Sequence, residues 1–330
     1  MKEREYVQAS TDISVVVTTY NQTQEALAFT LNSILRQNCD NFEIVIADDC
    51  STNDPSDFVR QHFDANGFSN YKIVRAEHNI GTVRNMLKGL TVASGRIIKP
   101  LSPGDGLYDQ STLTNILSFC DENHVALGFG GIMSYLPDGS KQPYNAPQSV
   151  ELYHLEDQNA SEILINHVLN TDWIPGCCLF YARDLMIPYL DELANRARVR
   201  YCEDLACPLC AADGVRIGSL GKNVIWYEMG TGISTSGGNA SVRRMYQDHR
   251  NFYEYLLDRL PDKTLARRAR RAFSIREFIA LHTPFYRMAQ KLKLNQYTCG
   301  ETKSIPSDNE ALSFFSQCVR VVSHANSWRP

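Results

Sequence analysis

Four short apolar runs, each followed by a segment with helical spacing, constrain the fold of this chain more than any other feature. The runs ISVVVTTY, FEIVIADD, YKIVRA and GRIIKPL begin at residues 13, 42, 71 and 95. Continuous runs of this kind are typical of strands buried on both faces of a parallel sheet. The intervening segments repeat apolar residues at helical spacing, as in Val83, Met86, Leu87 and Leu90. The alternation predicts a doubly wound, mostly parallel α/β sheet.

The pattern continues and then loosens along the chain. A helix is expected over 111–123 and a fifth strand in VALGFGGIMSY, which begins at residue 125. WIPGCCLFYARDLM, from residue 173, predicts a strand that turns into a helix, and a short helix is expected over 205–212. From about residue 241 the chain is expected to be helical, with a weakly ordered tail from about residue 298. These features predict an α/β domain over 1–240 and a helical C-terminal extension over 241–330.

Composition narrows the classes of function. The chain has 330 residues, 43% of them hydrophobic, and a net charge of -4, so no overall basic field indicates a nucleic-acid partner. The polar start MKEREYVQASTD does not fit a secretory signal, and no apolar run reaches the roughly 18 residues of a membrane span. We therefore expect a cytoplasmic protein whose ten cysteines are free thiols.

Polar residues follow the predicted strands. Strand one ends in TTYN at 18–21, strand two in DDCSTND at 48–54, and the third leads into HNIGTVRN at 78–85. The fourth leads through a Ser-Pro-Gly bend to Asp105. Because ligands of such sheets bind at the carboxyl ends of the strands, these residues are expected to line one pocket.

The motifs resemble a known family. SVVVTTYNQ, SILRQ, FEIVIADDCSTND and HNIGTVRNMLKGLTVASGRII are similar, in order and spacing, to family 2 glycosyltransferases of the GT-A fold, of the bacterial surface-polysaccharide type. YCEDLACPL and, more loosely, IWYEMGTGISTSG extend the resemblance over roughly 12–236. It implies a nucleotide-sugar half at 12–110 and an acceptor half at 125–236. It also implies transfer of a sugar from a nucleotide-diphosphate sugar, UDP-sugar first, to a hydroxyl of a glycan or lipid-linked saccharide, with inversion, in polysaccharide biosynthesis.

The same resemblance assigns the donor side. Tyr20 and Thr18, with neighbouring Thr19 and Asn21, are expected to contact the base and ribose. Asp49 is expected to accept a hydrogen bond from the base while Tyr20 stacks on the ring. Asp48 and Ser51 have an alternative interpretation as turn residues. Arg84 and Asn85 are expected on the diphosphate side, although a solvated helix position also explains Arg84.

The resemblance also implies a divalent metal, Mn²⁺ or Mg²⁺. The family ends its fourth strand in an acidic D-x-D type motif whose last acid binds the ion. In this chain Ser102 and Gly104 occupy positions that are often acidic, and Asp105 keeps the last one. One carboxylate can suffice, because Mg²⁺ commonly takes one or two protein carboxylates plus phosphates and waters. The alternative makes Asp105 a turn residue.

A second pair of acids lies in CEDLACPL. In the family a carboxylate at this place is the general base. Of the two acids Glu203 and Asp204, Asp204 aligns best with that position. The alternative is that both acids only favour a helix N-terminus. Trp173 and the following PGCC turn resemble the acceptor-side wall, although Trp173 also suits a hydrophobic core.

Two further segments carry weaker hypotheses. One hypothesis is a thiolate metal site formed by Cys202, Cys207 and Cys210 with Cys177 or Cys178. Their spacing lacks a paired C-x2-C, so buried thiols are the favoured interpretation. The segment 263–276 combines Arg267, Arg268, Arg270 and Arg271 with Leu265 and Phe273, which is typical of a helix on an anionic membrane. A solvated face or an oligomer contact is the alternative. The protein is accordingly expected to be cytoplasmic and peripheral on the inner face of the membrane.

Two other classes of function compete with a transferase. A catalytically decayed nucleotide-sugar or glycan-binding module is favoured by the thinned acidic motif. The retained Asp49, Asp105 and Asp204 argue against it. A nucleotidyltransferase would need a Gly-rich, basic phosphate loop after the first strand, and TTYNQTQE contains neither glycine nor lysine.

Overall fold

A mixed nine-stranded sheet forms the centre of the protein. The computed structural model describes residues 11–136, 139–230, 239–282 and 309–325. The strand order is β3-β2-β1-β4-β8-β6-β9-β5, with β7 beside β6. The strands are β1 (Ile13–Thr19), β2 (Phe42–Asp48), β3 (Tyr71–Arg75), β4 (Ile97–Leu101), β5 (Gly106–Leu107), β6 (Leu127–Tyr135), β7 (Lys141–Tyr144), β8 (Leu179–Ala182) and β9 (Gly218–Glu228).

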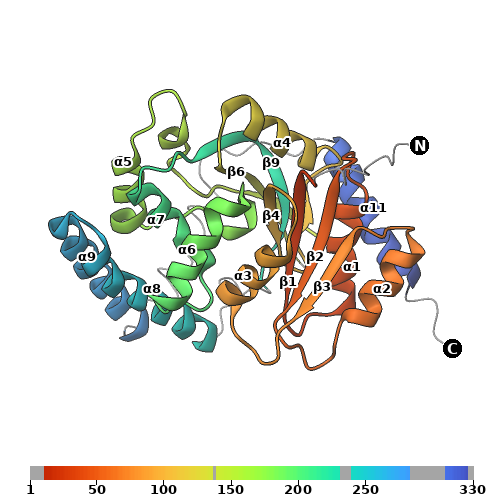
Figure 1. Ribbon diagram of the computed structural model, residues 1–330, viewed down its shortest axis with the longest axis horizontal. Helices are drawn as coiled ribbons and strands as arrows, with labels where there is room; N and C mark the ends of the chain where they lie inside the picture. Colours follow the sequence, from red (N-terminus) through yellow and green to blue (C-terminus); the bar gives the residue numbers. More distant parts are fainter. Residues whose placement is uncertain (1–10, 137–138, 231–238, 283–308, 326–330) are drawn as a thin grey trace, which may run out of the picture.

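The first four strands are parallel, as the apolar runs predict. Val15 in β1 pairs with Ile44 in β2 and with Lys99 in β4. Right-handed crossovers place α1 (Gln24–Leu35) and α2 (Ser56–Ala65) on one face and α3 (Thr82–Val92) on the other (Figure 1). The polar ends of β1, β2 and β4 therefore meet at one edge, which positions the candidate site.

The second half of the sheet contains a strand that the sequence did not predict. β9 runs parallel to β6, with a register shift near Gly131. Within β9, Gly221 has a φ of +69° and is followed by Lys222 and Asn223, a composition typical of a turn. This interruption hides an eleven-residue strand from pattern reasoning. The strand carries Glu228 to the same edge as Asp105.

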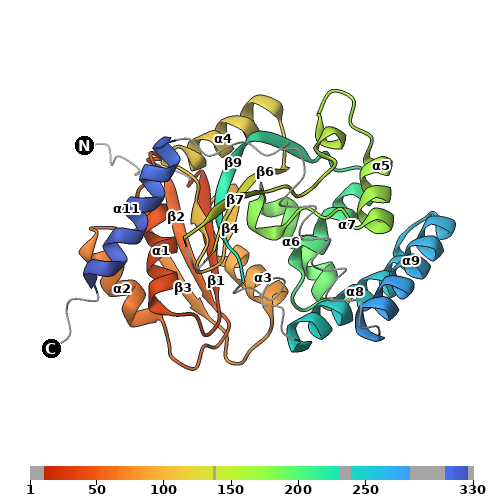
Figure 2. The ribbon, with the colours of Figure 1, turned by 180° about the vertical axis from the view of Figure 1, so that it is seen from behind.

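The remaining helices cover the two ends of the molecule. α8 and α9 lie beside α6 and α7, whereas α11 packs against α1 at the opposite end (Figures 1 and 2).

The expectation of a weakly ordered tail from residue 298 is wrong for 309–325, because apolar residues at helical spacing form α11 there. Residues 298–308 lie outside the described ranges. The division of the chain at residue 240 stays a prediction. These helices are α4 (Thr112–Asn123), α5 (Ala160–Ile165), α6 (Arg183–Asn195), α7 (Ala206–Ala212), α8 (Asn239–Arg259), α9 (Lys263–His282) and α11 (Asn309–Ala325).

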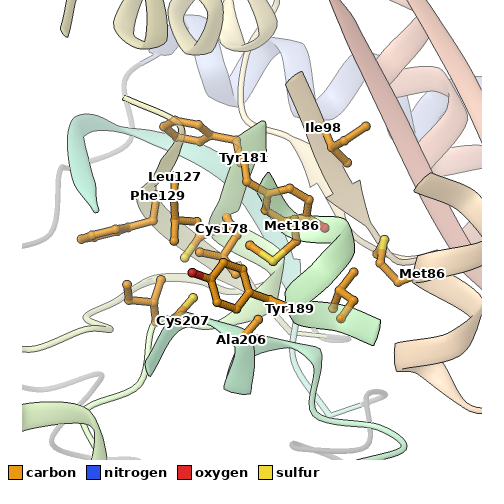
Figure 3. Packing of buried hydrophobic residues seen from close by; sticks show 14 of the residues in the cluster. Met86, Ile98, Leu127, Phe129, Cys178, Tyr181, Met186, Tyr189, Ala206 and Cys207 are labelled. Atoms are coloured by element: carbon orange, nitrogen blue, oxygen red, sulfur yellow. The ribbon is translucent and has the colours of Figure 1, made fainter. Parts of the chain in front are cut away.

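The cysteines of the described residues are free thiols, several of them in the core. Figure 3 shows Cys178 and Cys207 among Tyr181, Met186 and Tyr189, between β8, α6 and α7. Within the described ranges, no three metal-ligating side chains gather at one place. None of the helices described there has the length and apolarity needed to span a membrane.

Candidate functional site

The loop after β2 is held by Asp48. Its buried carboxylate accepts hydrogen bonds from the backbone N–H and hydroxyl of Ser51 and from Arg75 Nε at 2.9 Å. These are the contacts of a turn residue, and they agree with the structural interpretation of Asp48 and Ser51. The loop is thereby fixed in front of the sheet edge.

Asp49 lies one residue further and faces α3. Its two carboxylate oxygens accept hydrogen bonds from the N–H groups of Ile80 at 2.6 Å and Gly81 at 2.9 Å. Burial raises the pKa of Asp49, and the two N–H groups and Arg200 oppose that rise. Each carboxylate oxygen can accept more than one hydrogen bond, so these contacts leave acceptor capacity on Asp49.

The residues at the end of β1 differ in exposure. Thr18 is half-buried, Thr19 is buried, and Tyr20 is 46% exposed. Asn21, with a φ of +51°, donates its N–H to Ser51 Oγ and accepts from Thr52 N through its side-chain oxygen. Asn21 thus joins the loops after β1 and β2, and Tyr20 presents an aromatic surface beside them.

The two residues expected on the diphosphate side have protein partners. The exposed Arg84 donates to the carbonyl of Ala194 at the end of α6, at 3.0 Å. Asn85 is buried and donates to Ala47 O at 2.7 Å. In this structure both side chains tie α3 to its neighbours, and their role toward a diphosphate stays a prediction.

Asp105 is enclosed at the sheet edge. It is 5% exposed and accepts a hydrogen bond from the backbone N–H of Glu228 at 3.0 Å. Burial raises the pKa of Asp105 to about 7; the N–H of Glu228 and the charge of Lys99 oppose this rise, and the Glu228 carboxylate adds to it. The bend that precedes Asp105 is held by Thr30, whose hydroxyl donates to Asp105 O at 2.6 Å.

Glu228 is a candidate residue that the sequence analysis missed. Gly104 has a φ of +97°, and a Cβ there would lie 2.1 Å from Glu228 Oε2. The carboxylate of Glu228 therefore occupies the space that a side chain at position 104 would fill, and it lies beside Asp105. Two carboxylates therefore lie close together here, although the acidic motif itself carries Ser102 and Gly104 at its other positions. The available signal was a single acid directly after the apolar run VIWY.

Lys99 lies between the two acidic places of the site. It is fully buried in β4, and its Nζ donates to Cys177 O at 2.5 Å and Pro100 O at 3.0 Å. Burial lowers the pKa of Lys99 to about 8, while Asp105 and the thiols of Cys177 and Cys178 oppose the decrease. Lys99 thus links the Asp105 edge to the turn that carries Gly176.

Glu203 and Asp204 lie on the other side of that turn. Both are half-buried at the start of the 3-10 turn Glu203–Leu205 that leads into α7. A Cβ on Gly176 would lie 2.4 Å from Glu203 Oε1, so only glycine allows this approach. Burial raises the pKa of Asp204 to about 6. Burial and the charge of Asp204 raise the pKa of Glu203 to about 8.

Trp173 is packed rather than open. It is half-buried, and its ring stacks on His249 of α8 with centroids 5.7 Å apart and an interplanar angle of 11°. The His167 ring is tilted against the Trp173 ring, with the two centroids 5.6 Å apart. Trp173 therefore has protein contacts that suit a wall residue, and its contact with an acceptor stays a prediction.

The basic segment of α9 is less uniform than its sequence indicates. Arg270 pairs with Glu254 of α8 and is not part of an open basic face. Arg267, Arg268 and Arg271 are exposed, and Ile275 and Phe278, 55% and 62% exposed, follow on the same side of the helix. This set is called the α9 outer face below.

A mixed sheet with acids at its carboxyl edge fits the GT-A class of glycosyltransferase, and the comparisons with known proteins agree. The sequence model of Glycosyl transferase family 2 matches residues 14–181, slightly more than half of the chain. The chain therefore belongs to glycosyl transferase family 2. The predicted family, the GT-A fold and membership of a glycosyltransferase family are confirmed.

Similar proteins carry related names. The putative teichuronic acid biosynthesis glycosyltransferase TuaG of Bacillus subtilis is 29% identical over 140 residues, covering 42% of this chain and 54% of TuaG. A PGL/p-HBAD biosynthesis glycosyltransferase of Mycobacterium tuberculosis is 29% identical over 121 residues, covering 36% of this chain and 46% of the relative. Each match spans about half the length of the relative.

Solved structures share the fold over nearly the whole chain. S. aureus TarS 1–349 in complex with UDP-GlcNAc has a TM-score of 0.54 at 17% identity, covering 96% of this chain and 93% of that one. The mannosyltransferase PcManGT from Pyrobaculum calidifontis, in complex with GDP-Man and Mn²⁺, has a TM-score of 0.52 at 14% identity, covering 96% and 87%. At these identities the likeness is one of fold.

Proposed function

We propose that the protein transfers a sugar from a UDP-sugar to a hydroxyl of a glycan or lipid-linked saccharide, with inversion, in polysaccharide biosynthesis. One observation carries the proposal: acids gather at two places on the same edge, Asp105 with Glu228 and Glu203 with Asp204, and Lys99 links them. The names of TuaG and of the TarS complex support the pathway and the donor.

The donor half would bind the nucleotide across the ends of β1 and β2. Tyr20 would stack on the base, and Asp49 would accept a base N–H while Ile80 and Gly81 hold its carboxylate in place. Because those N–H groups favour the ionised form of Asp49, the side chain remains an acceptor.

The diphosphate side would hold a divalent metal through Asp105 and Glu228. The donor set fits Mg²⁺ or Mn²⁺, since both are oxygen ligands and the space beside Gly104 is filled by the Glu228 carboxylate. When bound, the ion would neutralise charge on the departing nucleotide diphosphate. Lys99, buried behind Asp105, contributes positive charge that opposes the rise in the pKa of Asp105 and so favours its ionised form.

Asp204 would be the general base. A sugar hydroxyl becomes a good nucleophile only when its proton has an acceptor, and a positioned carboxylate typically accelerates such a step by about 10²–10⁴-fold. A raised pKa makes Asp204 a stronger base than a solvated aspartate while leaving it ionised at neutral pH. Attack opposite the leaving diphosphate inverts the anomeric carbon.

The α9 outer face would contact an anionic membrane and bring the site near a lipid-linked acceptor. Three exposed arginines with adjacent exposed apolar side chains combine the two attractions that bind a helix to such a surface. This location at the inner membrane face is part of the proposal.

A thermal-shift screen tests the donor and metal assignments. UDP, GDP, dTDP and CMP are compared with and without Mn²⁺. UDP at a hundred times its Kd should stabilise the protein by about 2.7 kcal/mol, and Mn²⁺ should enhance the shift. A larger shift with GDP would change the donor, and no shift with any nucleotide would reject the proposed activity.

A further inference from the structure

One carboxylate of the C-terminal helices holds the segment that leads into the acidic pair. Asp248 in α8 is 3% exposed. Its Oδ1 accepts from the N–H of Arg200 at 3.0 Å, and its Oδ2 accepts from Tyr201 at 2.5 Å and Cys202 at 3.1 Å. Hydrogen bonds from backbone N–H groups to an ionised carboxylate are stronger than neutral ones. Three successive amides are therefore fixed to one side chain.

The held segment connects both sides of the candidate site. It continues without a gap into Glu203 and Asp204, and Leu205 N donates back to Cys202 O at 3.3 Å. Upstream, Arg200 O accepts from Val83 N at 3.0 Å, and the Arg200 guanidinium donates to Asn79 O at 2.8 Å. The Asn79 loop is the one whose N–H groups contact Asp49.

The next residue of α8 contacts the acceptor-side wall. His249 stacks on Trp173, as described above. Two consecutive residues of α8 thus contact the base-bearing segment and the predicted acceptor wall. α8 lies outside the part of the chain matched by the family model.

We propose that Asp248 is a positioning residue that holds the 200–204 segment so that Asp204 meets the acceptor hydroxyl held beside Trp173. The proposal rests on the proposed function. Asp248 would act by alignment of the base, because displacing a catalytic group by about 1 Å can lower the reaction rate about a hundredfold. Asp248 itself contacts neither donor nor acceptor in this mechanism.

Asp248→Asn tests the proposal, because it keeps the shape but replaces one accepting oxygen with an NH₂ group. Turnover is followed as UDP released from UDP-glucose, UDP-galactose or UDP-N-acetylglucosamine, whichever the wild type uses. We expect kcat to fall about tenfold to a hundredfold with the Kd for UDP unchanged. The charge of Asp248 contributes to the raised pKa of Asp204, the neighbour of Glu203, so loss of the Asp248 charge should also move the acidic limb of the kcat profile to lower pH.

Asp262→Asn is the matched control. Asp262 Oδ1 also accepts two backbone N–H groups, those of Thr264 and Leu265 at the start of α9, without contacting the 200–204 segment. Asp248→Glu, which keeps the charge but shifts it by one methylene, serves if Asp248→Asn does not fold. Wild-type kcat and an unmoved pH profile in a folded Asp248 variant would overturn the proposal.

Amide hydrogen exchange separates this inference from the donor assignment. The amides of 200–204 should exchange faster in Asp248→Asn and not in Asp262→Asn, whether or not UDP binds. If the wild type binds no nucleotide, the proposed function fails while the exchange result still decides on the Asp248 contact. Unchanged exchange at 200–204 rejects the positioning role.

Discussion

Glu203 and Asp204 are neighbours in the chain with different surroundings. Glu203 lies against Gly176 and has the higher pKa of the two, whereas the backbone N–H groups of Asp204 and Leu205 help to ionise Asp204. A group that must accept a proton at neutral pH has to be ionised there, so Asp204 suits the task better.

We predict that Asp204→Asn lowers kcat by about 10²–10⁴-fold with little change in UDP affinity, and that Glu203→Gln has a milder effect. In the wild type, kcat should rise with pH through about 6 as Asp204 loses its proton. UDP release and calorimetric binding measure the two quantities. An inactive Glu203→Gln beside an active Asp204→Asn would exchange the roles.

The raised pKa of Glu203 predicts how stability depends on pH. Between its unfolded pKa of about 4.3 and its folded pKa of about 8, the native state binds more protons than the unfolded state. This group's contribution is therefore full at low pH and is lost as pH rises through about 8. Glu203→Gln should stabilise the protein more at pH about 8 than at pH about 5, as measured by urea unfolding. Parallel changes with the exposed Glu122→Gln would contradict this.

Asp105 and Glu228 predict the strength of metal binding. Asp105→Asn should abolish the Mn²⁺-dependent part of UDP binding, and Glu228→Gln should weaken it, because each removes one anionic oxygen ligand. Mn²⁺ binding is measured directly from the EPR signal of the free ion, without turnover. Asp121→Asn, which removes an exposed charge paired with Arg96, is the control. Wild-type Mn²⁺ affinity in both variants would place the ion elsewhere.

At the scale of elements, the C-terminal helices α8 and α11 contact the sheet domain at opposite ends of the molecule (Figure 1). α8 contacts the base-bearing segment, and α11 packs on α1, where Asn32 donates to Cys318 O at 3.1 Å. α9 pairs with α8 and leaves its outer face exposed.

The α9 outer face predicts binding to vesicles of anionic lipid. Replacing Arg267, Arg268 and Arg271 by Gln should release the protein in a sedimentation assay at low salt, since each surface-proximal arginine contributes about 1 kcal/mol. The control replaces three exposed cations elsewhere, Arg60, Arg216 and Lys222. Equal loss in both triple variants would show a general charge effect, and a wild type that never sediments would exclude the membrane contact.

α11 predicts a large loss of stability when its central aromatic is removed. Phe315 is 8% exposed, and its ring lies 4.8 Å from Trp226 and 5.3 Å from Phe29. Phe315→Ala should reduce the free energy of unfolding by about 3–5 kcal/mol, measured by urea denaturation. The exposed neighbour Ser316→Ala should change it by less than about 0.5 kcal/mol. A small effect of Phe315→Ala would mean that α11 is not part of the cooperative core.

At the scale of the whole molecule, local sequence patterns predicted the parallel strands β1 to β4 and did not predict β9, which joins β6 to β5 in the sheet. Val15 and Ile44 lie in runs whose burial is evident from the sequence, so β1 and β2 were predictable. β9 was not, because Gly221 and its polar neighbours interrupt it.

The same limit applies to the site. Asp105 and Asp204 lie in recognisable motifs, and the structure encloses both beside further acids. Glu228 is 123 residues from Asp105 in the chain, and Asp248 acts on residues 46–48 positions away. Such contacts depend on how the sheet and helices pack, which no local spacing encodes.

The place of α11 bears on how the chain is made. Trp226, Tyr108 and Phe29 are covered by a helix that begins at Asn309, about 80 residues after β9 ends. At ribosomal rates, synthesis of the residues between β9 and α11 takes about 4–16 s, and these rings stay uncovered for that time. During translation the nearly finished sheet therefore presents an aromatic patch to chaperones. A premature stop before α11 would leave that patch permanently open to aggregation.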